Sequence, residues 1–349
     1  MATKRIIIAD TDEEYIVSIQ HKFIEEFFGK IALEIITDRQ YFKELFMKPQ
    51  SADILIITDE LYDNSILKHR IGKVFILTEK EDLSNLNNEE SYIFKYSNIR
   101  EIFGKIISNS KEILDDIGNG NKKTEIVLVD SANGGAGKTT VALGVCTNLA
   151  RSYKNILYMN TVGINTYQYI LGNNKTIDDS ECSIFLDEQS ISYENIEHII
   201  QKGEFDYLLP FSKPLASLGI DRCIYNRIVQ VIKDSGSYDA IIVDADNGFD
   251  EYKVNMMGLA DRVVIVLNQN LNSVMATEIM VKNINDINSD KYIFVCNNFD
   301  ENENNAIKEH SIINSKVENY IGHITNYDRK KCREIAQETA IKKISYLII

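Results

Sequence analysis

The chain has 349 residues, of which 44% are hydrophobic and 26% are charged, and its formal net charge is −14. These values are ordinary for a globular protein with a sizeable core, and they exclude collagen, coiled-coil fibres and long-range disorder. At roughly 150 residues per domain, the length predicts two or three domains. The sequence has no stretch of about 18 uncharged apolar residues, so we expect no membrane-spanning helix.

Five cysteines and five histidines are dispersed along the chain, and no CxxC pair occurs. This spacing is typical of reduced, mostly buried thiols in a cytoplasm, and it gives no sign of a metal cluster. The first residues run directly into the strand-like segment 6–9, which leaves no room for a signal peptide. We therefore expect a cytoplasmic protein, and the acidic balance predicts no specific binding to nucleic acid.

The first 115 residues alternate strand-like and helix-like segments. Apolar residues recur at helical spacing over residues 13–28. Short apolar runs predict strands at residues 6–9, 31–36, 54–57, 74–77 and 92–94. Strands with intervening helices predict a mostly parallel sheet with helices on both faces, which is an α/β fold.

A polar, glycine-bearing segment, DIGNGNKK at residues 116–123, has the composition of a linker. It divides the chain into two predicted domains, residues 1–115 and residues 124–349. The second domain begins a new series of strands and helices. Its predicted strands are residues 126–130, 156–159, 207–209, 240–243, 262–267 and 292–296.

A glycine-rich segment joins the first strand of this second series to the helix-like run 141–150. Its glycines permit backbone conformations and a close phosphate approach that a Cβ atom would hinder, and its amides would lie at the positive end of the following helix. Lys138 is placed for the β- and γ-phosphates, and the Thr139 hydroxyl for Mg²⁺. The alternative is a glycine-rich turn without a ligand. The predicted binding residues are Asn133, Gly134, Gly135, Ala136, Gly137, Lys138, Thr139 and Thr140.

This segment resembles the deviant Walker A motif of the MinD/ParA family, Lys-Gly-Gly-x-Gly-Lys-Thr-Thr. Residues 238–248 (YDAIIVDADNG) are similar to that family's Walker B strand and second switch, and the resemblance implies that Asp244 binds Mg²⁺ through water. It also implies that Asn297, at a strand end, contacts adenine. The resemblance extends over most of residues 124–349, so the expected fold is a P-loop NTPase and the expected cofactors are ATP and Mg²⁺. Thr139 and Asp244 are the expected metal ligands.

Two departures from the family pattern bear on hydrolysis. Asn133 stands where the family has its signature lysine, and Asn160 and Val162 stand where the first switch has its two aspartates. A positioned acid or base contributes about 10²–10⁴-fold to a rate, and a cation supplied by a partner about 10³–10⁵-fold. We therefore predict an ATP-dependent homodimer with weak or absent turnover and no catalytic residue. Asp246 is interpreted as a solvated residue of the second switch.

Residues 4–115 resemble a response-regulator receiver domain, which has a flavodoxin-like fold. The matching positions lie at strand ends and are Asp10, Asp12, Thr78 and Lys95. The phosphoacceptor position holds Thr58, and Asp59 is one residue late, which reverses its direction on a strand. The prediction is a receiver-like docking module that does not use phosphorylation; the alternative is a generic α/β domain.

Two further segments are weaker signals. Residues 329–333 (RKKCR) form a basic cluster, which we interpret as a solvated helix face and alternatively as a DNA contact. The tail 341–349 is interpreted as ordinary packing and alternatively as an amphipathic membrane anchor.

A degenerate receiver followed by a MinD/ParA-like domain resembles the TadZ/CpaE family, which positions the Flp (type IVc) pilus assembly machine at the cell pole. The resemblance implies a homodimer, partners in the pilus assembly and secretion machinery, and peripheral association with the inner membrane through those partners. The first alternative is an active ParA- or MinD-type ATPase that positions DNA or the division site. The second is an output protein of two-component signalling.

Overall fold

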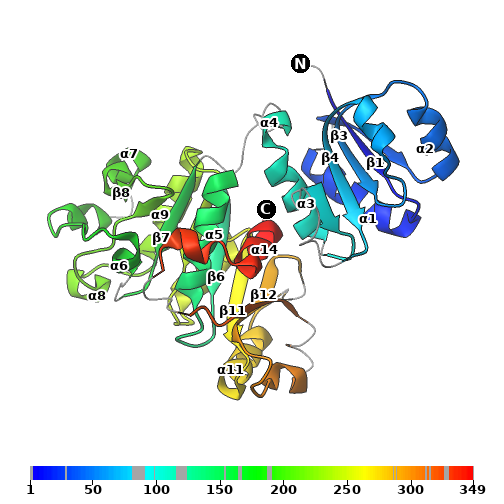
Figure 1. The fold of residues 1–349 in the computed structure, drawn as a ribbon. Coiled ribbons are helices and arrows are strands. Elements are labelled where there is room, and N and C mark those ends of the chain that lie inside the picture. The colour runs from blue at the N-terminus through cyan, green and yellow to red at the C-terminus, as the bar shows by residue number, and fades with distance from the viewer. Residues whose placement is uncertain are drawn as a thin grey trace. The chain divides into compact units, whose positions relative to one another are not determined.

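The computed structural model describes residues 3–27, 30–80, 91–97, 99–114, 124–152, 155–163, 167–186, 191–285, 287, 289–310, 313, 316–325 and 330–348. The chain forms two compact units, one of Met1–Asn121 with Tyr346–Ile349 and the other of Lys122–Ser345. Each unit contains its own sheet (Figure 1). The expected linker, residues 116–123, lies outside the described residues.

The first unit is built on a five-stranded sheet with the order β2-β1-β3-β4-β5, and every pairing in it is parallel. The strands are β1 (Lys4–Ala9), β2 (Ile31–Ile36), β3 (Ser51–Thr58), β4 (Arg70–Thr78) and β5 (Tyr92–Phe94). The helices are α1 (Glu13–Phe27), α2 (Arg39–Phe46), η1 (Asn64–Lys68), α3 (Ile99–Asn109) and α4 (Lys111–Leu114). The strands and the parallel α/β sheet predicted for this region are confirmed.

Both faces of this sheet are buried because side chains alternate along each strand. Ile6 and Ile8 pack on one face with Phe23 of α1. Ile7 packs on the other face with Phe42 of α2. A strand buried on both sides needs a continuous apolar run, which is why the sequence located these strands well.

The second unit is built on an eight-stranded sheet with the order β13-β12-β11-β6-β10-β7-β9-β8. All of its pairings are parallel except that of β8 with β9. The strands are β6 (Glu125–Asp130), β7 (Ile156–Asn160), β8 (Ile200–Gln201), β9 (Asp206–Leu208), β10 (Ala240–Asp244), β11 (Arg262–Asn268), β12 (Tyr292–Phe299) and β13 (Val317–Gly322). The predicted mostly parallel sheet is confirmed, and β8 and β13 are strands that the sequence analysis missed.

Helices flank this sheet (Figure 1). They are α5 (Lys138–Ser152), α6 (Tyr167–Leu171), α7 (Tyr193–Ile196), α8 (Leu215–Leu218), α9 (Ile224–Ser235), α10 (Glu251–Leu259), α11 (Leu271–Lys282), α13 (Cys332–Ile335) and α14 (Thr339–Ile348). Short 3-10 turns are η3 (Glu181–Phe185), η5 (Glu197–Ile199) and η6 (Ala306–Glu309). Among the described residues, no helix is long and apolar enough to span a bilayer.

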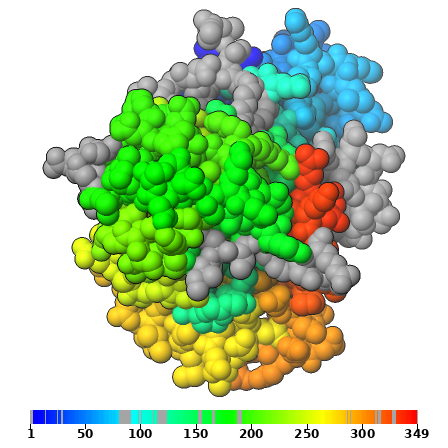
Figure 2. Space-filling model, turned by 90° about the vertical axis from the view of Figure 1, so that its left-hand side faces the viewer, coloured from blue at the N-terminus to red at the C-terminus, as the bar shows by residue number. Residues whose placement is uncertain are grey.

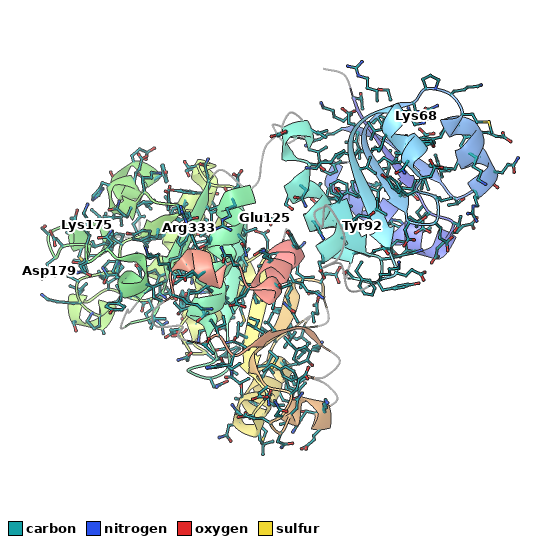
Figure 3. All side chains as sticks on the ribbon, viewed as in Figure 1. Lys68, Tyr92, Glu125, Lys175, Asp179 and Arg333 are labelled. Atoms are coloured by element: carbon teal, nitrogen blue, oxygen red, sulfur yellow. The ribbon has the colours of Figure 1, made fainter. Side chains whose placement is uncertain are left out.

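The carboxyl ends of the parallel strands meet at one edge of the second sheet. Glu125, labelled in Figure 3, begins β6, and Asp130 ends it. Asp244 at the end of β10 is in register with Asn160 of β7. Ligands of open α/β sheets bind at this edge, so the fold gathers polar side chains where a binding site is expected.

Candidate nucleotide-binding site

The loop between β6 and α5 has a backbone that depends on glycine. Gly135 and Gly137 have φ angles of +75° and +95°, which side-chain-bearing residues rarely adopt. A Cβ atom at Gly137 would lie 2.0 Å from Nδ2 of Asn297. The loop therefore passes close to β12, and this approach excludes any larger residue at position 137.

Lys138 is the first residue of α5, and its side chain points into the strand-end edge. Its Nζ donates to Oγ of Ser131 at 2.8 Å and also to Oδ1 of Asn247. Burial lowers the pKa of the Lys138 ammonium, and the nearby carboxylates of Asp130 and Asp244 oppose that shift. The ammonium is thus bound by neutral oxygens within a negatively charged surrounding.

Asp244 is fully buried, and one of its oxygens accepts several hydrogen bonds. Oδ2 accepts from the hydroxyl of Thr139 at 2.7 Å, from the hydroxyl of Tyr158 at 2.8 Å and from the amide of Asn160 at 2.7 Å. Burial raises the pKa of the Asp244 carboxyl, and these donors together with Lys138 oppose the rise. The other oxygen, Oδ1, is buried without a hydrogen-bond partner in the described part of the chain.

This arrangement fits a hard cation such as Mg²⁺, which prefers oxygen ligands and retains several waters. The orphaned Oδ1 of Asp244 can accept from a metal-bound water, and the Thr139 hydroxyl can offer a lone pair while it donates to Asp244. Among the described residues, no group of three or more His, Cys, Asp or Glu side chains could bind a metal. Thr139 and Asp244 would hold the ion, and the remaining ligands would come from phosphate and water.

Asn160, one of the two positions expected to correspond to a first switch, lies beside this carboxylate. Asn160 donates through Nδ2 to Asp244, and its Oδ1 accepts from the backbone N–H of Val162 at 3.0 Å. The Val162 side chain is half-buried and apolar. Neither side chain can deprotonate or orient a water as a carboxylate would.

Asn133 and Asn297 both brace the loop. The hydroxyl of Ser273 in α11 donates to Oδ1 of Asn133 at 2.9 Å, and Asn133 Nδ2 donates to the carbonyl of Gly134 at 3.2 Å. Asn297 is 4% exposed and donates through Nδ2 to the carbonyl of Ala136 at 2.8 Å. In Figure 2, the blue-green surface, which belongs to the first residues of this unit, borders the yellow surface of β11 and α11. The hydrogen bond between Ser273 and Asn133 joins these two parts of the chain.

The second-switch segment is anchored by residues that the sequence analysis missed. Lys253 of α10 is fully buried, and its Nζ donates to Oδ1 of Asp130 at 2.5 Å and to the carbonyl of Asp246 at 2.7 Å. Burial raises the pKa of the Asp130 carboxyl, and Lys253 opposes that rise. This ion pair joins the base of the phosphate loop to the second switch.

The side chain of Asp246 is also engaged. Arg222 forms an ion pair with Asp246 at 2.7 Å and with Asp250 at 3.0 Å, and its guanidinium lies 4.9 Å from the ring centroid of Tyr252. The interpretation of Asp246 as a solvated residue is therefore wrong, because its carboxylate is half-buried and paired. The motif comparison covered residues 238–248, and the partner Arg222 lies outside that segment.

A second group of polar side chains lies at the strand ends of the first unit. Lys95 Nζ lies 2.9 Å from Oδ2 of Asp10 and 3.6 Å from Oδ2 of Asp12. Thr78 donates to Oδ2 of Asp59 at 2.7 Å, and Thr58 is buried. A cavity of about 260 Å³ is lined by residues that include Asp10, Asp12, Thr58, Asp59 and Lys95, and Lys95 partly neutralises its acids.

The basic cluster at residues 329–333 and the tail at residues 341–349 contact other parts of the chain where the structure describes them. Arg333, labelled in Figure 3, donates through Nε to both carboxylate oxygens of Glu204 at 3.0 and 2.8 Å. Lys330 bonds Glu338 at 3.0 Å, and Arg329 lies outside the described residues. In α14, Ile341 packs against α5, where a Cβ atom on Gly144 would stand 2.7 Å from it.

Solved structures share this fold. A ParA-family ATPase from Chlorobium tepidum superposes with a TM-score of 0.53 at 14% identity, over 65% of this chain and 97% of that one. The MinC:MinD cell division complex of Aquifex aeolicus gives 0.50 at 22% identity, over 64% and 94%. Pyrococcus horikoshii MinD in complex with Mg-ADP gives 0.50 at 16% identity, over 64% and 94%. The fold is that of the MinD/ParA P-loop ATPases.

Curated relatives are similar over a shorter stretch. The septum site-determining protein MinD of Buchnera aphidicola is 25% identical over 157 residues, and that of Neisseria meningitidis is 24% identical over 152 residues. These matches cover 43% of this chain and 55% of each relative, so the chain spans about half the length of the curated relatives it matches. The model of an AAA domain, AAA_31, matches residues 124–298, half of the chain. The protein therefore belongs to the AAA_31 family of AAA domains.

Proposed function

We propose that residues 124–349 form a domain that binds ATP with Mg²⁺ and pairs with a second copy, with weak or absent hydrolysis. The observation that supports this proposal is the set of hydrogen bonds that the Asp244 carboxylate accepts. Its Oδ2 accepts from Thr139, as a P-loop site requires, and also from the amide of Asn160, where an active relative would place a carboxylate. The site keeps its phosphate- and metal-binding groups and lacks its water-activating one.

The residues present explain binding without turnover. The loop amides and Lys138 would bind the phosphates, and Thr139 and Asp244 would bind the metal, which would neutralise phosphate charge. Asn133 has a neutral side chain, which is hydrogen-bonded to Ser273 of its own chain, so it offers no cation to a partner. The Pyrococcus relative binds Mg-ADP, which supports the same ligand class here.

The direct test measures binding and turnover separately. Purified full-length protein should bind Mg-ATP, and Lys138→Ala should weaken that binding at least tenfold because the charge-assisted contact to phosphate is lost. Steady-state hydrolysis should remain near background in the unaltered protein. Several turnovers per minute would favour the alternative, an active ATPase that positions DNA or the division site.

Pairing is tested by sedimentation velocity with ATP, ADP and no nucleotide. A ligand shifts such an equilibrium only by its differential affinity for the two states, so ATP should increase the dimer fraction in a concentration-dependent way. The same distribution in all conditions would point to a constitutive scaffold.

For the whole chain we propose a polar localisation factor for Flp (type IVc) pilus assembly, resembling TadZ/CpaE. The support is the first unit, whose sheet order β2-β1-β3-β4-β5 is that of flavodoxin-like folds. Its phosphoacceptor position holds a buried threonine, Thr58. In this proposal residues 1–115 are a receiver-like docking module, 116–123 a linker, and the partners are pilus assembly and secretion proteins at the inner membrane.

The cellular test is a fluorescent fusion at the native locus. The fusion should mark a cell pole, and deletion should remove surface pili. A fusion that follows the nucleoid or the division site, with pili unaffected, would favour the positioning alternative.

A further inference from the structure

The side-chain oxygen of Asn247 accepts a hydrogen bond from the ammonium group of Lys138. Lys138 Nζ donates to Oδ1 of Asn247 and, at 2.8 Å, to Oγ of Ser131. The phosphate-loop lysine is the group that meets the β- and γ-phosphates of a bound nucleotide. The amide oxygen of Asn247 therefore accepts from the same ammonium group that a phosphate oxygen would approach.

A second contact places Asn247 over the loop itself. A Cβ atom at Gly134 would lie 3.2 Å from Nδ2 of Asn247. The carboxamide thus extends from the lysine to the first glycine of the doublet. Asn247 is an exposed residue, so its side chain can turn into solvent without a burial penalty.

The residues beside Asn247 are fixed. The carbonyl of Asp246 accepts from the buried Lys253 at 2.7 Å, and the Asp246 carboxylate pairs with Arg222 at 2.7 Å. A Cβ atom at Gly248 would lie 3.4 Å from the Arg222 guanidinium. Release of Lys138 therefore requires a rotation of the Asn247 side chain and leaves the anchored backbone in place.

The number of N–H donors on Lys138 distinguishes a nucleoside diphosphate from a nucleoside triphosphate. An ammonium has three N–H donors, and Ser131 and Asn247 accept two of them. The third is sufficient for a β-phosphate oxygen. A γ-phosphate needs a further donor, and the one held by Asn247 is the donor that an exposed residue can give up.

We propose that Asn247 competes with the γ-phosphate for Lys138 and thereby sets the preference of this site for ATP over ADP. The inference rests on the proposed nucleotide binding and adds a residue that determines specificity. Asn247 lowers the affinity for the triphosphate and leaves that for the diphosphate nearly unchanged. Occupancy by ATP then requires a higher ATP concentration than the loop alone would need.

The experiment measures Kd for Mg-ATP and Mg-ADP by isothermal titration calorimetry on the full chain. Asn247→Ala should bind ATP about three- to tenfold more tightly, because a competing charge-assisted hydrogen bond is removed, and ADP within about twofold of the unaltered protein. Asn247→Asp should weaken ATP at least tenfold, through an ion pair with Lys138 and repulsion of the γ-phosphate, and weaken ADP less.

Asn255→Ala is the matched control, since Asn255 is an exposed asparagine of the neighbouring α10. Its two Kd values and its melting temperature should equal those of the unaltered protein. The inference is overturned if Asn247→Ala changes ATP and ADP affinity by the same factor or weakens ATP. Absence of nucleotide binding in the unaltered protein would instead refute the proposed function itself.

Discussion

The amide of Asn160 donates to the buried Oδ2 of Asp244 at 2.7 Å, across two parallel strands in which the residues are register partners. An asparagine here stabilises the ionised carboxylate. An aspartate would instead place a second negative charge beside a fully buried carboxylate. The asparagine at this position therefore avoids a charge repulsion that an aspartate would cause.

The first prediction concerns this pair. Asn160→Asp should lower the free energy of unfolding by about 2 kcal/mol or more at neutral pH, because two buried carboxylates disfavour each other's charged forms. Burial already raises the folded-state pKa of Asp244. A carboxyl whose pKa is higher in the folded than in the unfolded state destabilises the fold progressively as pH rises from the unfolded-state pKa to the folded-state pKa. The stability deficit of Asn160→Asp should therefore shrink in acid.

Urea unfolding across that pH range measures the effect. Asn160→Ala is the control, since it removes the amide without adding charge and should show a smaller loss with a weaker dependence on pH. A deficit of Asn160→Asp that is the same at acidic and neutral pH would contradict the prediction.

The second prediction concerns the approach of the phosphate loop to β12. Gly137→Ala should abolish detectable ATP binding, because its Cβ atom would overlap the amide of Asn297 and because the φ of +95° is strained for alanine. Removing the amide as well, in Gly137→Ala with Asn297→Ala, should relieve the overlap and leave the backbone strain. Binding by the double variant should therefore be partial. Full binding by Gly137→Ala alone would show that the loop moves freely.

The third prediction concerns the buried pair of Lys253 and Asp130. Lys253→Met should cost about 3–5 kcal/mol of unfolding free energy, because it leaves an uncompensated buried carboxylate. Lys253→Met combined with Asp130→Leu should recover most of that loss, since both charges are gone. A double-mutant cycle in guanidinium chloride gives the coupling energy, and strictly additive effects would mean that the pair does not interact.

The fourth prediction concerns the first unit. Acetyl phosphate should leave no acid-labile adduct on residues 1–115, since in the proposed receiver-like module Thr58 holds the acceptor position, and the carboxylate of Asp59 accepts from Thr78. Intact-mass and peptide mass spectrometry make the measurement, with a phosphorylatable receiver as positive control. An adduct on Asp59 would show that this carboxylate is available after all.

The sequence located the strands with continuous apolar runs, such as β1 and β11, because parallel strands buried on both faces require them. It missed β13, whose residues alternate between buried and exposed at the sheet edge, and β8, which has two residues. The fold class was therefore accessible, and the edges of the second sheet were not.

The residues of the site also fall into those that a local sequence pattern predicts and those that it does not. Lys138 and Thr139 belong to one short segment, so a linear pattern predicts them. The contacts of Asn247 with Lys138 and of Lys253 with Asp130 join residues 109 and 123 positions apart. Such contacts depend on how the strands are ordered in the sheet, which no local pattern encodes.

The buried pair of Lys253 and Asp130 has an evolutionary consequence. Each residue protects the other, so a single substitution at either position passes through a protein with one isolated interior charge. Lineages descending from such a sequence are expected to retain both residues or to have exchanged both. Co-occurrence of an acid at position 130 with a lysine at position 253 would then mark sequences that share this anchoring of the second switch, whatever partner or cellular position they have acquired.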